Sequence, residues 1–74
     1  MGGSIRQFNA RELERLLSRF GFVQISQKGS HRKWRNVSTG HRVIVPFHAG
    51  RDLPSGTLRS ILVNSGIPEN EWKV

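Results

Sequence analysis

The sequence contains no cysteine, which excludes disulfide bonds, thiolate metal ligands and cysteine nucleophiles. It has no apolar run near the roughly 20 residues that a membrane span needs, and its N-terminus lacks the charged and then apolar layout of a secretory signal. We therefore expect a cytoplasmic protein without a membrane partner. The few carboxylates form no pair and no histidine-containing cluster with metal-ligand spacing, so we expect neither a metal nor another cofactor.

Positive charge is what the chain has in excess. Twelve Lys and Arg stand against five Asp and Glu, which gives a formal net charge of +7 over only 74 residues. Such a field attracts polyanions, so nucleic acid is the leading partner, an acidic protein the second and an anionic membrane surface a distant third. The length predicts one small domain over residues 1–74. Residues 1–4 are expected to be disordered or left over from cloning.

An amphipathic helix is predicted over residues 10–20. Asn9 and Glu12 have the spacing of a capping box, in which each side chain accepts a hydrogen bond from the other residue's backbone. Gly21 follows the helix as a left-handed terminator. The apolar residues recur at i, i+3, i+4 and i+7, at Leu13, Leu16, Leu17 and Phe20.

Three short strands are predicted next, over residues 22–28, 31–37 and 41–47. Apolar and polar residues alternate in them, and Pro46 marks the end of the third strand or an edge position. The connections around Gly29 and Gly40 are short enough only for tight turns, which predicts an antiparallel meander.

A second helix follows, because apolar residues recur at helical spacing from Leu58 to Leu62 and Gly66 ends the pattern. Asp52 or Ser55 is predicted to cap it, and one further turn over residues 68–72 packs Trp72 back on the body. The fold class is thus α+β, with the order α-β-β-β-α. Two helices on one face of a three-stranded antiparallel sheet bury both apolar stripes most simply.

Alternation along the strands predicts which side chains face the helices. We expect the inner set to be Val23, Ile25, Trp34, Val43 and Val45, and the outer set to be Gln24, Ser26, Lys28, His31, Lys33 and Arg35. The outer face is then bare and basic, which is either an ordinary solvated surface or a binding surface. Trp34 has an alternative position on the outer face, where it would stack on nucleic-acid bases.

His31 is the candidate catalytic residue. Near neutral pH an imidazole can accept a proton from a ribose 2′-hydroxyl or give one to a departing 5′-oxygen, without a metal. The preceding Gly29 lets the backbone approach a phosphate closely, and Lys28 and Ser30 can donate to it. The alternative is a histidine with only a structural or surface role. The candidate RNA-binding residues are Lys28, Gly29, Ser30, Lys33 and Arg35, and the candidates for catalytic assistance are Ser30 and His48.

Several segments together resemble the HicA toxin family. The resemblance runs from about Ile5 to Trp72. The Gly-Ser-His element at residues 29–31 together with the Gly-Thr-Leu-Arg-Ser-Ile-Leu segment at residues 56–62 is specific at this spacing, whereas neither motif alone would be. The segments are Arg11-Glu12-Leu13, Gly21-Phe22, Gln27-Lys28-Gly29-Ser30-His31, Val45-Pro46-Phe47-His48, Asp52-Leu53-Pro54-Ser55-Gly56-Thr57-Leu58-Arg59-Ser60-Ile61-Leu62 and Gly66-Ile67.

This resemblance implies a toxin of a type II toxin–antitoxin system, with a fold like that of a double-stranded-RNA-binding domain. The family is described as mRNA interferases, endoribonucleases that cleave messenger RNA and inhibit translation, and we expect the RNA to be single-stranded. The implied protein partner is a HicB-type antitoxin that covers the active site. The family's catalytic histidine corresponds to His31, and His48 also falls in a family motif.

Two other functions fit the same charge pattern. The first is a non-enzymatic RNA-binding module of the same fold. Such modules usually place several lysines at the start of the final helix, and this chain has only Arg51 and Arg59 there. The second is a surface that serves only an acidic protein partner.

Overall fold

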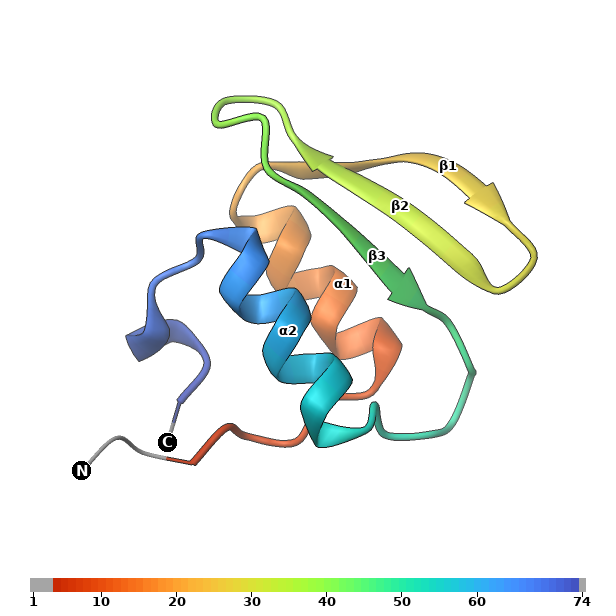
Figure 1. The fold of residues 1–74 in the computed structure, drawn as a ribbon, viewed down its shortest axis with the longest axis vertical. Helices are drawn as coiled ribbons and strands as arrows, with labels where there is room; N and C mark the ends of the chain where they lie inside the picture. The colour runs from red at the N-terminus through yellow and green to blue at the C-terminus, as the bar shows by residue number, and fades with distance from the viewer. Residues whose placement is uncertain (1–3, 74) are drawn as a thin grey trace.

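The computed structural model describes residues 4–73, so the expectation for residues 1–4 lies outside the described residues except at Ser4. Within that range, no helix has the length and apolar character to cross a membrane. The observed order confirms the predicted α-β-β-β-α fold (Figure 1). The elements are α1 (Ala10–Arg19), β1 (Phe22–Lys28), β2 (His31–Asn36), β3 (Arg42–Pro46), α2 (Ser55–Ser65) and the short 3-10 helix η1 (Glu69–Glu71).

Helix α1 begins at the predicted residue and carries the predicted capping box. The Asn9 side chain accepts a hydrogen bond from the Glu12 N–H at 2.8 Å, and the Glu12 carboxylate accepts one from the Asn9 N–H at 2.9 Å. Two N–H groups that the helix start would leave unpaired are thereby satisfied. The helix ends at Arg19, one residue before the predicted end, because Phe20 leaves the helical conformation and Gly21 follows with a φ of +90°.

The three strands form an antiparallel sheet in the order β1-β2-β3. Strand β1 has the predicted bounds, whereas β2 ends one residue early and β3 is one residue shorter at each end. Asn36 explains the early end of β2. Its side-chain oxygen accepts hydrogen bonds from the N–H groups of Ser38 and Thr39, at 2.8 and 3.0 Å, and so turns the chain toward β3.

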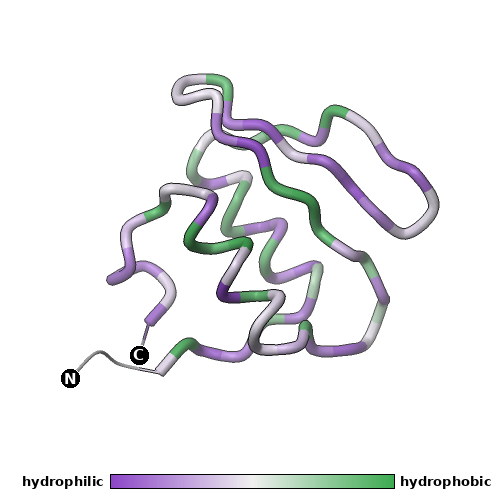
Figure 2. The backbone as a smooth tube through the Cα atoms, in the orientation of Figure 1, coloured by the Kyte–Doolittle hydropathy of each residue, from purple (hydrophilic) through white to green (hydrophobic). Residues whose placement is uncertain are grey.

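Both helices pack on the same face of the sheet, and the opposite face is uncovered (Figure 1). Hydrophobic segments run along the two helices and β3, while β2 is largely hydrophilic (Figure 2). Trp34 is buried in the core, with its side chain toward the helices. The predicted core position is therefore confirmed, and the alternative of an outward base-stacking platform is wrong.

The predicted alternation is wrong in the first half of β1. Val23 and Ile25 are each 46% exposed, because the buried Phe22 takes the first inner position. Gln24 pairs with Trp34 and so lies on the helix side, not on the outer face. A bulge between Gln24 and Ser26 then shifts the register by one residue. From that bulge onward, the predicted outer positions are correct.

Helix α2 lacks the predicted side-chain cap. Its N-cap is Pro54, which makes no side-chain hydrogen bond, and Ser55 is already the first helical residue. Asp52 is not the cap because its backbone pairs with Asn9 in an isolated β-bridge. The C-terminal predictions hold. Gly66 ends the helix in the left-handed conformation, with a φ of +74°.

The predicted final turn is present as η1, and Trp72 packs back on the body. Its indole N–H donates to the Ile67 carbonyl at 2.9 Å, and the side chain is buried in the core. A buried tryptophan with its N–H satisfied adds a large apolar area to a core this small. The segment after α2 is therefore part of the folded unit.

The bulge can be tested by two matched truncations on the sheet. Val43 is 5% exposed, so Val43→Ala should lower the free energy of unfolding by about 2 kcal/mol. Ile25→Ala should cost less than about 1 kcal/mol, because half of that side chain is already in water. Urea denaturation measures both. A loss at Ile25 as large as that at Val43 would contradict the observed register.

Candidate functional site

The sheet is the cationic half of the molecule. The three strands contain Lys28, Arg32, Lys33, Arg35 and Arg42, and they contain no Asp or Glu. All five carboxylates of the chain lie in α1, in η1 or in the loop before α2. The excess positive charge is thus concentrated on one layer, and the uncovered face of that layer is open to an anionic ligand.

His31 lies in a depression on the uncovered face, which we call the His31 depression. The structure brings Lys28 and Lys33 to the same depression, as the alternation predicts. The imidazole is exposed, and its ring makes no hydrogen bond to another described residue. The ring is therefore accessible to a ligand, and the two lysines that line the same depression can attract an anionic group of that ligand. The depression is lined by Ser26, Lys28, His31, Lys33 and Ile44.

The turn between β1 and β2 places His31 at the first position of its strand. Lys28 pairs with His31, so the loop contains only Gly29 and Ser30. Gly29 has a φ of +59°, a conformation that costs glycine little and that two-residue hairpin turns require. The Ser30 carbonyl accepts a hydrogen bond from the Phe47 N–H at 2.6 Å, which joins the turn to the end of β3. The histidine is thus held by backbone pairing on both sides.

Glu14 binds the side chains of β2 that face the helices, on the opposite side of the strand from His31. It reaches from α1 to the sheet, where its carboxylate accepts a hydrogen bond from the Trp34 indole N–H at 3.0 Å. The Arg32 guanidinium pairs with the same carboxylate at 2.9 Å. Arg32 also stacks on the Phe47 ring, 3.8 Å from its centroid. Because Arg32 and Trp34 alternate with His31 and Lys33, these inner contacts determine which residues face outward.

The structure does not bring every predicted residue into the His31 depression. Gly29 and Ser30 form the adjacent turn, and Arg35 lies further along β2. His48 is exposed after β3 and lines a separate depression with Arg51 and Asp52. Pro46 lines the His48 depression and pairs with His31 across the sheet, so the His48 depression begins on the strand next to His31.

Ser26, Ile44 and Arg42 were missed as site residues by the sequence reasoning. Ser26 and Ile44 line the His31 depression, and both pair with Lys33. The signal for Arg42 and Ile44 was present, since the predicted inner positions of Val43 and Val45 place both on the outer face. Their position beside β2 could be recognised only from the register of the sheet.

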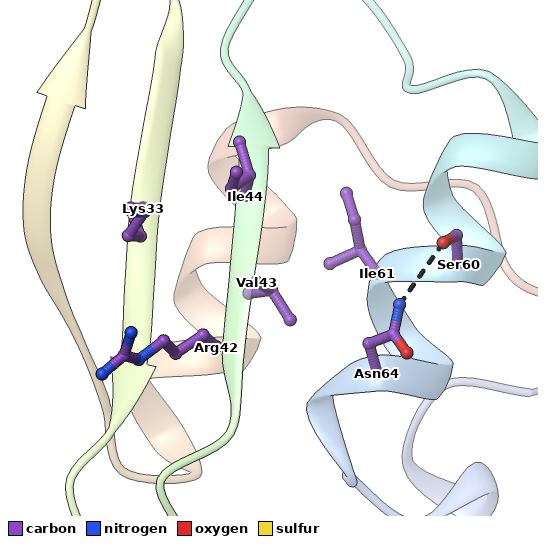
Figure 3. Close-up of a pocket in the computed structure, with 7 residues that line it drawn as sticks. All are labelled: Lys33, Arg42, Val43, Ile44, Ser60, Ile61 and Asn64. Atoms are coloured by element: carbon purple, nitrogen blue, oxygen red, sulfur yellow. Dashed lines mark hydrogen bonds between the residues drawn. The ribbon is translucent and has the colours of Figure 1, made fainter.

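A groove beside β3 borders the uncovered face (Figure 3). Val43 points toward Ile61 at its floor, and Ser60 and Asn64 of α2 line its far wall. Arg42 and Lys33 lie at its edge nearest the sheet. The groove has an apolar floor and cations on one side, so it continues the basic surface to the edge of the sheet.

No group of three His, Asp or Glu side chains that could hold a metal ion occurs within residues 4–73. The side chains of the uncovered face can themselves offer proton transfer by an imidazole and charge stabilisation by lysine and arginine.

Comparison with known proteins identifies one family. A profile described as the HicA toxin of bacterial toxin–antitoxin systems matches residues 10–67. The matched segment begins at the first residue of α1 and continues past the Gly66 cap of α2, so it includes all three strands. No curated protein matches the chain.

Glu14 can be tested by Glu14→Gln, which keeps the shape but turns one acceptor into a donor. The new amide N–H group must face either the Trp34 indole or the Arg32 guanidinium, so the free energy of unfolding should fall by about 2–3 kcal/mol. Glu71→Gln, on an exposed residue, should change it by less than about 0.5 kcal/mol. If urea denaturation gave equal changes in the free energy of unfolding for the two variants, the Glu14 contacts would not stabilise the packing of α1 on the sheet.

Proposed function

Since this chain belongs to the HicA toxin family, we propose that it is an endoribonuclease that cleaves messenger RNA and inhibits translation, with His31 as its general acid/base. The observation that carries the proposal is the His31 depression, where an exposed imidazole lies with Lys28 and Lys33 on a surface free of carboxylates. The cytoplasm is where such a substrate is found.

The proposed reaction uses only groups of the RNA and the protein. The ribose 2′-oxygen attacks the adjacent phosphorus while His31 accepts the 2′-hydroxyl proton. The bond from phosphorus to the 5′-oxygen breaks, and the departing oxygen takes a proton from a second acid. The products are a 2′,3′-cyclic phosphate and a 5′-hydroxyl. No redox step and no metal-bound water is needed.

The lysines supply the electrostatic part of the proposed mechanism. Charge accumulates on the non-bridging oxygens of the phosphate as the 2′-oxygen attacks, and Lys28 and Lys33 lie beside His31 to stabilise it. Gly29 and Ser30 form the turn beside this point, where Ser30 can assist by a hydrogen bond. Arg35, further along β2, extends the proposed contact with the RNA backbone.

An antitoxin partner is implied by membership of the family. We propose that a HicB-type antitoxin covers the His31 depression. A basic surface without carboxylates favours an acidic partner there, and the partner would then compete with RNA for the same cations.

His31→Ala should lower the rate of RNA cleavage by about 10²–10⁴-fold, the usual contribution of a positioned acid/base. His41→Ala is the matched control. His41 lies just before β3, at the end of the β2–β3 pair that is opposite to His31, and its ring forms a hydrogen bond with the Thr39 hydroxyl. Cleavage of a single-stranded RNA is measured in EDTA by gel electrophoresis. The same RNA with a 2′-deoxyribose at the mapped cleavage site should remain intact.

The outcomes separate the competing functions. Wild-type cleavage by His31→Ala would remove His31 from the mechanism. Binding of RNA by the wild-type protein without cleavage, even after long incubation, would favour a non-enzymatic RNA-binding module. Tight binding to an acidic antitoxin with no affinity for RNA would favour a surface that serves only a protein partner.

His48 is the proposed second group, acting as the acid that protonates the 5′-oxygen. The charged groups that share its depression are Arg51 and Asp52. His48→Ala should reduce the rate of RNA cleavage about 10²-fold, the usual contribution of a positioned acid. The measurement is the same gel assay of single-stranded RNA in EDTA, with His41→Ala as the control. A cleavage rate that His48→Ala leaves unchanged would assign the second proton transfer to water or another group.

A further inference from the structure

Two arginines face each other across the outer side of the sheet. Arg35 of β2 pairs directly with Arg42 of β3. The neighbouring Asn36 N–H donates to the His41 carbonyl at 2.8 Å, so Asn36 and His41 form a hydrogen-bonded pair. Such pairs alternate with non-hydrogen-bonded ones along an antiparallel sheet, so the adjacent pair of Arg35 and Arg42 is non-hydrogen-bonded. Side chains approach each other most closely in such pairs, where the Cα atoms are about 4.5 Å apart. Like charges placed directly opposite each other in this way destabilise a sheet.

Nothing in the described part of the protein compensates this repulsion. Neither arginine forms an ion pair with a carboxylate of residues 4–73, where the two ion pairs are those of Arg32 with Glu14 and of Lys73 with Glu69. The strands carry no acidic residue that could pair with them. The Arg42 side chain extends from β3 across β2, on the side of the sheet where Lys33 lies (Figure 3). Both guanidinium groups are therefore available to an external anion.

We propose that Arg35 and Arg42 form a second phosphate-binding subsite, which we call the arginine clamp. This inference rests on the proposed function in that the phosphate belongs to the RNA. Guanidinium groups suit this role because each presents a planar set of donors that can bind a phosphate through two hydrogen bonds. A phosphate between the two arginines also removes the repulsion that the free protein carries.

The position of the clamp defines the substrate more narrowly. Arg35 lies four residues after His31 on β2, which corresponds to about 13 Å at the rise of a strand. That distance is longer than the separation between neighbouring phosphates of one RNA strand. The clamp therefore binds a phosphate beyond the neighbour of the scissile one, and the substrate is an oligonucleotide laid along β2. Lys33 lies between the two subsites and can contact the intervening backbone.

The test measures RNA binding without cleavage. The protein carries His31→Ala, and a fluorescent single-stranded 12-nucleotide RNA reports binding by anisotropy over a series of salt concentrations. Arg35→Gln with Arg42→Gln is compared with Arg11→Gln and Arg15→Gln, two exposed residues of α1. Each double variant lowers the formal net charge from +7 to +5, so any effect of net charge is shared.

Loss of the clamp should weaken binding about 10-fold or more, because hydrogen bonds to a charged group are lost. The slope of log K against log salt should become shallower by about 0.7, the value for one phosphate contact on a single strand. The α1 variant should change neither quantity by a comparable amount. Equal effects of the two double variants would overturn the clamp, as would RNA binding that neither variant weakens.

Further outcomes distinguish the clamp from its alternatives. No RNA binding by the His31→Ala protein at low salt would contradict the clamp, and so would a variant that loses only affinity for an acidic protein. A clamp effect in a protein whose parent does not cleave RNA would leave the clamp standing and refute the proposed nuclease. The melting temperature without RNA should stay equal or rise when the arginines are replaced. A fall of several degrees would indicate a structural role and overturn the clamp.

Discussion

The carboxylate of Glu14 is the contact on which the arrangement of the sheet depends. One carboxylate from α1 accepts the Trp34 indole N–H and pairs with the Arg32 guanidinium, two residues apart on the central strand. Both partners are cations or donors that would be costly to bury without an acceptor. The Phe47 ring covers the other side of Arg32 and so adds the end of β3 to the same cluster. A single acidic side chain thereby joins the helix layer to the central strand and to the region where β3 ends.

This inner contact has a consequence for the outer face, because side chains alternate along a strand. Holding Arg32 and Trp34 inward places His31, Lys33 and Arg35 outward, and a shift by one residue would exchange the two sets. The face that results contains an imidazole among cations, and all the carboxylates of the chain lie elsewhere. Because Glu14 lies in the helix layer, its negative charge does not reduce the positive charge of the outer face of the sheet. It neutralises the one strand arginine that points inward and leaves the outward cations unneutralised.

Local patterns in the sequence predicted most of the fold, and long-range pairing limited the rest. The capping box, the Gly29 turn and the Gly66 helix end were predictable because each depends on residues close together in the chain. The bulge after Gln24 was not, since it is defined by pairing with β2, and it reversed the predicted sides of Val23 and Gln24. The absent cap of α2 has a similar cause, because a backbone bridge to Asn9 holds Asp52 outside the helix. For the candidate site, the alternation predicted Lys28, His31 and Lys33 together, whereas Arg42 required the register.

The outer face also shows how stability and binding oppose each other in a domain of this size. Cations on neighbouring strands repel one another, and a carboxylate among them would stabilise the free protein. The same carboxylate would repel the phosphates of the proposed RNA substrate and would pair with the cations that are proposed to bind them. Arg35 and Arg42 show this conflict between stability and binding most clearly. Their two positive charges lie directly opposite each other, in the type of strand pair that brings side chains closest. The fold remains stable despite this repulsion because its core, which includes Trp34, Trp72 and the buried faces of the helices, lies on the other side of the sheet. Binding of an anion, whether an RNA phosphate or an acidic group of a partner, then relieves repulsion as well as forming new contacts.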